Sequence, residues 1–267
     1  MTPTVEESRA FAQRGATWPA EDGSAMVHIP AGDFLYGPGA VRAYAGDFAL
    51  AQHPVTNRQW KRFVEETNYL PDPAHPLGDR YLAHWQDGDP GPLVDHPLTH
   101  ISWVDARHYC RWSGLALPTE IMWEKAARGV DGRPYPWGWG SPLTYRREGH
   151  RWVAQWVPHV GQPKTAPVGW NPALRTAWGC QDMIGNVSEI CEPGGPSLDE
   201  SDLSETLLAA HVRLRGSAFL RRTVDRGRMT CAHTRRLRTT GRNQWVGFRP
   251  AFVFDSSPVE SDLSPPP

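Results

Sequence analysis

Thiols and imidazoles are the side chains of this sequence best suited to metal chemistry. Thiolates bind soft metal ions and do redox chemistry, and imidazole is a common metal ligand. The four cysteines show no CxxC spacing and no other spacing typical of a metal site; they are Cys110, Cys180, Cys191 and Cys231. The 11 histidines are scattered along the chain. A metal-binding triad would need distant histidines to converge in space, and we do not expect one; the candidates are His53, His96, His100, His108 and His233.

Guanidinium groups dominate the C-terminal third of the chain. Residues 212–249 contain eleven Arg, no Lys, no Glu and a single Asp, Asp225, and so carry a formal charge of +10 in a chain whose net charge is −1. Such a block attracts anionic partners, or it is a face that is solvated or paired with the acidic run 192–205. Both interpretations stay open from the sequence. No nucleic-acid-binding motif accompanies the arginines, so we rank nucleic acid last among the partners.

Length and composition set the outer limits. A chain of 267 residues fits one large domain or two small ones, and 13 Trp with 25 Gly and 26 Pro favour a folded protein with much irregular structure. Residues 1–18 lack the apolar core of a signal peptide, and no apolar run approaches the ~20 residues of a membrane-spanning helix. We therefore expect a cytoplasmic protein with free thiols and no membrane insertion.

Capping residues and alternating patterns predict the secondary structure. Two capping boxes and a Pro-Thr-Glu run each open a helix, and glycines close two of them: Thr56 with Gln59, Ser102 with Asp105 before Gly114, and Pro118-Thr119-Glu120 before Gly129. Strands are predicted at 26–34, 212–218, 228–233 and 246–254. Long loops are expected at 71–97 and 192–205. The expected division is a lead-in at 1–22, one domain at 23–254 and a disordered tail at 255–267.

Several ordered motifs then resemble one known family. They are Ser102-Trp103-x-Asp105-Ala106-x-x-Tyr109-Cys110-x-Trp112, Leu117-Pro118-Thr119-Glu120-x-x-Trp123-Glu124-x-Ala126-Ala127-Arg128-Gly129, Tyr135-Pro136-Trp137-Gly138, Ala166-Pro167-Val168-Gly169, Asp182-Met183-x-Gly185-Asn186-Val187-x-Glu189, Leu214-Arg215-Gly216-Ser217 and Gly247-Phe248-Arg249. Together they resemble the formylglycine-generating enzymes and sulfatase-modifying factors over residues 26–254. The resemblance implies an α+β, C-type-lectin-like fold, with two main helices around small antiparallel sheets and much ordered coil.

The sequence departs from this family where its chemistry resides. The enzymes carry two copper-binding cysteines just after the Arg-Gly-Ser motif, and here Leu220 and Asp225 stand at about those positions. An aliphatic side chain does not bind metal, and a lone carboxylate is a poor partner for Cu(I). We therefore expect no bound copper and no oxidation by that mechanism. The remaining late cysteine, Cys231, is interpreted as a buried packing residue.

The resemblance also implies a calcium loop. Asp182 and Glu189 would supply carboxylates, and the carbonyl groups of Gly185 and Val187 would supply neutral oxygens, which suits Ca²⁺. The alternative is that the two carboxylates cap backbone N–H groups in a tight loop. Calcium is the one cofactor expected, in a structural role.

A second group with this fold suggests a function. The variable proteins of diversity-generating retroelements vary a C-terminal segment that ends near a Gly-Phe-Arg motif, and residues 219–245 here have a similar composition. The sequence thus favours a non-catalytic protein that binds a protein or other macromolecular ligand through Arg221, Arg222, Thr223, Asp225, Arg226, Arg228, His233, Arg235, Arg236, Arg238, Thr239, Arg242 and Asn243. The alternative is a metal-dependent oxidase or oxygenase of the wider family with an altered active site.

Overall fold

The computed structural model describes residues 17–71, 80–140, 143–148, 151–156, 164–192, 210–219 and 229–254. The predicted tail at 255–267, most of the lead-in and most of the acidic run 192–205 lie outside these residues.

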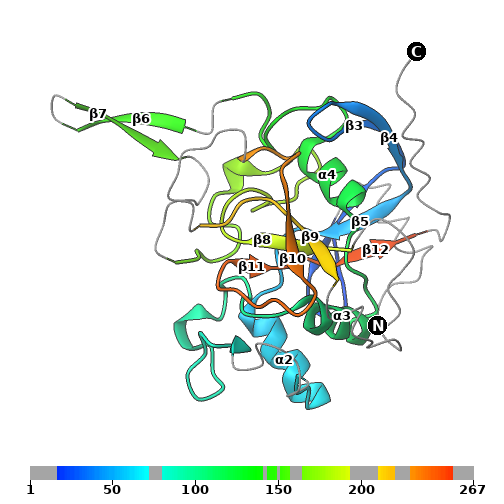
Figure 1. Ribbon diagram of the computed structural model, residues 1–267, viewed down its shortest axis with the longest axis vertical. Coiled ribbons are helices and arrows are strands. Elements are labelled where there is room, and N and C mark those ends of the chain that lie inside the picture. Colours follow the sequence, from blue (N-terminus) through cyan, green and yellow to red (C-terminus); the bar gives the residue numbers. More distant parts are fainter. Residues whose placement is uncertain are drawn as a thin grey trace.

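Three α-helices form where the capping residues predicted them (Figure 1): α2 spans Asn57–Thr67, α3 Trp103–Trp112 and α4 Glu120–Arg128. The capping boxes of Thr56 with Gln59 and of Ser102 with Asp105 are both present, and Thr119 caps α4 through the Met122 N–H. The first helix ends at Asn68, which adopts the left-handed conformation (φ 53°) that Asn tolerates. The described part therefore has one helix more than the two main helices implied by the family resemblance.

One four-stranded sheet joins the two ends of the domain. Its order is β1 (Trp18–Pro19), β2 (Ala25–Ile29), β5 (Phe48–Ala51) and β12 (Ala251–Val253), and all neighbours are antiparallel. A hairpin of β3 (Gly32–Tyr36) and β4 (Val41–Ala45) lies between β2 and β5 in the sequence. Because β12 pairs with β5, the C-terminal end of the described chain completes a sheet begun at its N-terminal end.

The second four-stranded sheet carries the arginine-rich block. Its order is β10 (Thr234–Arg238), β9 (His211–Arg215), β8 (Ser188–Cys191) and β11 (Val246–Gly247), with β11 parallel to β8 and the other pairs antiparallel. The strand predicted at 228–233 is wrong in position, because Met229–His233 form turns and the strand begins at Thr234. The run predicted at 246–254 is interrupted at residues 248–250 and contributes a strand to each sheet.

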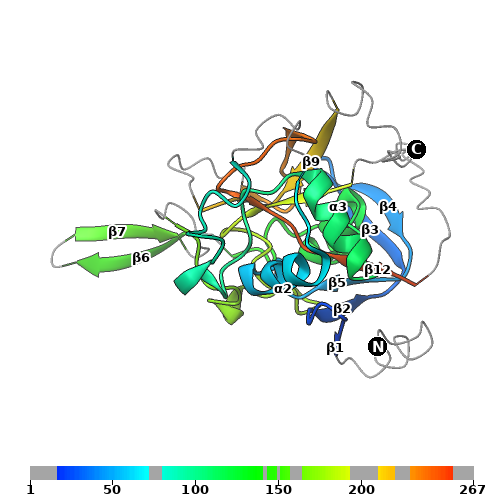
Figure 2. The same cartoon turned by 90° about the horizontal axis from the view of Figure 1, so that it is seen from below.

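The remaining elements are short. Two 3₁₀ turns occur at Gly91–Leu93 and Pro172–Leu174. Strands β6 (Leu143–Glu148) and β7 (Arg151–Trp156) form a hairpin that extends from the body of the molecule (Figures 1 and 2). Within the described residues, no helix has both the length and the apolar composition that crossing a membrane would need.

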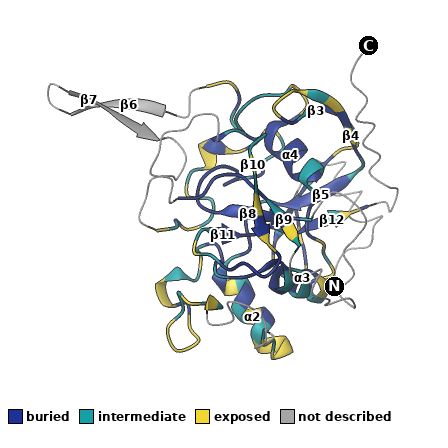
Figure 3. Cartoon of the chain, viewed as in Figure 1, coloured by how far each residue is buried: buried dark blue, intermediate teal, exposed yellow. Residues whose placement is uncertain are grey.

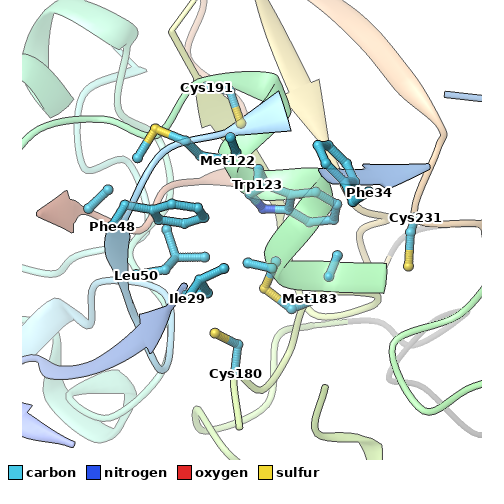
Figure 4. Packing of buried hydrophobic residues seen from close by; sticks show 14 of the residues in the cluster. Ile29, Phe34, Phe48, Leu50, Met122, Trp123, Cys180, Met183, Cys191 and Cys231 are labelled. Atoms are coloured by element: carbon cyan, nitrogen blue, oxygen red, sulfur yellow. The ribbon is translucent and has the colours of Figure 1, made fainter. Parts of the chain in front are cut away.

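Two hydrophobic cores hold the layers together. In the first, α4 packs with β2, β5 and the β3–β4 hairpin around Trp123, which is fully buried (Figure 4). In the second, α2 and α3 pack beside the second sheet around Trp60 and Trp103. Figure 3 shows the buried interior running through β8 and β11, with exposed residues along β10. The molecule is thus an α+β protein, as the sequence predicted.

Candidate functional site

A fully buried ion pair joins two of the motifs identified in the sequence, the one that ends at Glu189 and the Gly-Phe-Arg motif that ends at Arg249. Arg249 donates from Nε to Glu189 Oε2 at 2.7 Å and from Nη2 to Oε1 at 2.8 Å, and both side chains are 0% exposed. The indole Nε1 of Trp123 donates to the same Oε2 at 2.7 Å. Burial of two charges is favourable only when their hydrogen bonds are satisfied, and here the pair is bidentate and further supported.

Every N–H of the Arg249 guanidinium has an acceptor. Beyond the two bonds to Glu189, Nη1 donates to the carbonyls of Ala51 and Gln52, and Nη2 donates to that of Gln181. One side chain therefore ties the end of β5, the loop before β8 and β8 itself together. This accounts for the Gly-Phe-Arg motif as a structural element.

The predicted calcium loop is occupied by these protein contacts. Asp182 is 6% exposed, and its Oδ2 accepts the Gly169 N–H at 2.6 Å, while Glu189 is held by Arg249. Desolvation raises the pKa of the Asp182 carboxyl to about 6, against the lowering effect of the Gly169 bond. The set Asp182, Gly185, Val187 and Glu189 therefore stays a predicted calcium site, at which an ion would compete with Arg249 for the Glu189 carboxylate.

A second buried cluster joins α4 to β9. Glu124 accepts from Arg215 through Oε2 and from Arg128 at 2.7 Å through Oε1, and Arg215 also donates to the Cys231 carbonyl at 2.7 Å. The next residue, Gly216, has φ +73°, and a Cβ there would stand 2.7 Å from the Met183 carbonyl oxygen. Only glycine fits this approach, so the Arg-Gly-Ser motif is also structural.

Two residues of the predicted ligand-binding set lie in the interior instead of on the surface. Arg242 is 1% exposed and forms a bidentate pair with Asp105, with both bonds at 2.9 Å. Thr239 is 0% exposed, and its carbonyl accepts the Trp103 N–H at the start of α3. Asp105, which also caps α3, stabilises Arg242 in the interior, because a buried carboxylate needs a cationic partner.

All four cysteines are free thiols in the interior. Burial raises the pKa of each thiol, to about 11 for Cys180. Three of them, Cys180, Cys191 and Cys231, lie on different sides of the core around Trp123 (Figure 4). Cys231 is a packing residue, as predicted, although it lies in a turn. Thiols that stay protonated in the interior are poor nucleophiles and poor metal ligands.

The histidines do not assemble into a metal site in the described part of the chain, where no three His, Cys, Asp or Glu side chains lie close enough to hold an ion. His100 stacks on His84 with ring centroids 5.0 Å apart. His96 bonds to Thr165 Oγ1 at 2.8 Å, and His108 packs on the Tyr69 ring.

A hollow of about 490 Å³ opens beside the start of α2, lined among others by Gln52, His53, Arg58 and Arg62. Burial lowers the pKa of His53 to about 4, so this imidazole is neutral at pH 7. Its Nε2 is buried without a hydrogen-bond partner among the described residues. Both arginines at the rim already pair with carboxylates, Arg58 with Asp95 and Arg62 with Glu66.

The described arginines of the predicted contact set that reach the surface lie on β10. Arg236 and Arg238 are exposed, and Arg235 is half-buried over the Trp245 ring, 5.7 Å from its centroid. His233 and Asn243 are half-buried on either side of the strand. The other six predicted contact residues lie outside the described residues; they are Arg221, Arg222, Thr223, Asp225, Arg226 and Arg228.

Two neighbouring residues of this surface were missed by the sequence analysis. Strand pairing places Arg213 directly opposite Arg236 and His211 opposite Arg238. His211 is exposed and Arg213 is half-buried, so β9 and β10 share one basic face. The alternation of Arg213 and Arg215 in a predicted strand was visible in the sequence, but the pairing partner and register were not.

The fold and these motifs define a class of protein with a coil-rich α+β domain stapled by buried arginine–carboxylate pairs. The chain belongs to the sulfatase-modifying factor enzyme 1-like domain family, whose model matches residues 13–252.

Relatives of known sequence and structure agree with this assignment. The formylglycine-generating enzyme of Thermomonospora curvata is 32% identical, covering 65% of this chain and 72% of that protein. The inactive C-alpha-formylglycine-generating enzyme 2 of Mus musculus is 34% identical, covering 43% of this chain and 51% of its own. Among solved structures, PvdO from Pseudomonas aeruginosa has a TM-score of 0.64 at 20% identity, covering 89% of this chain and 98% of that one. Variable protein 1 of Treponema denticola has a TM-score of 0.55 at 15% identity, covering 86% and 95%. These two likenesses concern the fold.

Proposed function

We propose that this chain is a non-catalytic ligand-binding protein that presents a basic surface, centred on β9 and β10, on a formylglycine-generating-enzyme type scaffold. The observation that carries the proposal is the state of the thiols. The four cysteines of the sequence are all buried with raised pKa values, and the segment 218–226 contains none. Copper oxidation by a pair of exposed thiolates has no thiolates to use.

The scaffold supports this proposal because its buried ion pairs join protein groups alone. The buried pairs of Arg215, Arg242 and Arg249 with carboxylates lie beneath the surface, while Arg236 and Arg238 on β10 are exposed. Substitutions at exposed positions usually change the free energy of unfolding by less than about 0.5 kcal/mol. A surface of this kind can change its contacts while the fold persists.

Two similar proteins are compatible with the proposal. The murine relative is named as an inactive member of the family, and one structural neighbour is named a variable protein. If the chain is variable, residues 219–245 should differ among related strains beside an adjacent reverse transcriptase and template repeat. An invariant segment without these neighbours would remove the retroelement origin and leave the binding role to be tested separately.

The direct test is copper binding and turnover. The purified protein is titrated with Cu(I) against a competing chelator, and oxygen consumption is followed with a cysteine-containing peptide as substrate. We expect no stoichiometric copper and no turnover above buffer. The Thermomonospora curvata enzyme, handled in parallel, is the positive control. One equivalent of tightly held copper together with peptide oxidation would contradict the proposal and favour the oxidase alternative.

A further inference from the structure

Among the described strands, β10 lies at the edge of its sheet. Its sheet order places β9 on one side and no described strand on the other. The Thr239 N–H donates to the Ala210 carbonyl, which fixes which residues of β10 bond to β9. Along an antiparallel strand, every second residue directs its N–H and C=O toward the partner strand. Leu237 and Arg235 therefore bond to β9, and Arg236 between them directs its N–H and C=O outward.

Among the described residues, the outward N–H and C=O of Arg236 have no partner. In the part of the chain that the structure describes, no main-chain bond reaches its N–H or C=O, whereas the Arg238 carbonyl accepts the Gly241 N–H. An open strand edge is a template for another strand. Proteins often use such an edge to bind an extended peptide, with main-chain bonds giving affinity and alternate side chains giving specificity.

Two exposed arginines of this edge, Arg236 and Arg238, carry positive charge that no described carboxylate compensates. Arg213 and Arg236 face each other as a pair without mutual main-chain hydrogen bonds, the arrangement that brings side chains closest. Like charges placed directly opposite destabilise a sheet. Glu120 is 3.4 Å from Arg213 and is shared with Arg215, and no described carboxylate pairs with Arg236 or Arg238.

We propose that an acidic, extended peptide segment of a partner protein adds as a strand to β10, with carboxylates at alternate positions facing Arg236 and Arg238. This inference rests on the proposed binding function and names its ligand class. The spacing fits, because alternate residues on both strands of a pair are ~7 Å apart and opposite side chains are about 5 Å apart. A nucleic acid would use the charges but not the open N–H and C=O of Arg236, so we favour a peptide.

The test measures binding of a fluorescently labelled nine-residue peptide of alternating Glu and Val by anisotropy. Three comparison peptides have the same length: alternating Lys and Val, the same Glu and Val residues grouped in two blocks, and the alternating Glu peptide with N-methylated amides. We expect the alternating acidic peptide to bind at least about tenfold more tightly than each of them. Binding should weaken as salt is raised, because the contacts are exposed.

The matched variants locate the site. Arg236→Glu combined with Arg238→Glu should weaken binding of the acidic peptide at least about tenfold. Arg42→Glu, an exposed arginine on β4 with 80% of its side chain accessible, should leave binding unchanged. Thermal melts of both variants establish that the fold is retained.

Several results would overturn the inference. They are no detectable binding, equal binding of the lysine, grouped or N-methylated peptides, insensitivity to the β10 variant, or tighter binding of a single-stranded oligonucleotide of equal charge. If the β10 variant instead self-associates while peptide binding is unchanged, the arginines serve only to protect the edge. A protein that binds no peptide and also neither binds copper nor oxidises substrate would lose this inference alone. Copper-dependent turnover would remove the proposed function itself.

Discussion

The arginines of the interior and those of β10 come from the same basic block but do different work. Arg215, Arg242 and Arg249 are each at most 1% exposed and bind carboxylates, whereas Arg236 and Arg238 are exposed. The formal charge of +10 in residues 212–249 is therefore partly an internal framework. The number of charges in a stretch of sequence does not show whether they form a binding surface or buried ion pairs.

The largest expected effect comes from removing the buried Arg249–Glu189 ion pair. Arg249→Met leaves Glu189 buried without a counter-charge and should lower the free energy of unfolding by about 3–5 kcal/mol. Urea denaturation measures this, with Arg42→Met as the exposed control. Adding Glu189→Gln to Arg249→Met should recover part of the loss. A loss below about 1 kcal/mol would break the comparison, because the interior pair would then behave like a surface one.

A matched pair of substitutions near one another in sequence tests the same contrast. Arg242→Met removes the partner of buried Asp105 and should cost about 3 kcal/mol, while Arg238→Met should change stability by less than about 0.5 kcal/mol. Both are measured by urea denaturation at the same pH. Similar losses at the two positions would show that β10 is as integral to the core as the residues that follow it.

Asp182 is an interior carboxylate that accepts a main-chain N–H from Gly169 instead of pairing with an arginine. Because its pKa is raised from 3.8 to about 6, its contribution to stability is present below pH 3.8 and is lost as pH rises through 6. As pH rises from 4 to 7.5, the free energy of unfolding of Asp182→Asn should therefore increase relative to that of the parent protein by about 2 kcal/mol. Urea midpoints across this range provide the measurement. A difference that does not vary with pH would contradict the raised pKa.

The smallest effect is expected from calcium. Since Arg249 holds Glu189, adding Ca²⁺ or a chelator should move the melting temperature by no more than about 1 °C. Differential scanning calorimetry of the intact protein decides this. A clear calcium-dependent rise would mean that Glu189 can leave Arg249, and the interior staple would then be exchangeable.

Local signals in the sequence were sufficient to predict the helices but not to predict which strands pair. Capping residues such as Thr56 and Ser102 act within one turn, so their spacing predicted α2 and α3. The prediction of a strand at 228–233 was wrong because its apolar residues, Met229 and Cys231, lie in turns with their side chains buried. The Cys231 N–H bonds to the Pro134 carbonyl and not to a neighbouring strand. β10 was not predicted, because three of its five residues are arginine and only Leu237 packs into the core.

The candidate site shows the same limit. The absence of a thiol pair after the Arg-Gly-Ser motif was legible in the sequence, as was the basic composition of the block. Which arginines face inward was not, because that depends on carboxylates more than 50 residues away, such as Asp105 for Arg242 and Glu189 for Arg249. Burial of a charge is decided by its partner, and the partner is fixed by the tertiary structure.

The five bonds of the Arg249 guanidinium also constrain when the domain can form during synthesis. Its acceptors at Ala51, Gln52, Gln181 and Glu189 all leave the ribosome before it does. Until residue 249 emerges, the nascent chain holds a carboxylate that cannot be enclosed, and β5 lacks the strand β12 that completes its sheet. The domain should therefore close only after nearly all of it has been translated, with little native structure locked in beforehand.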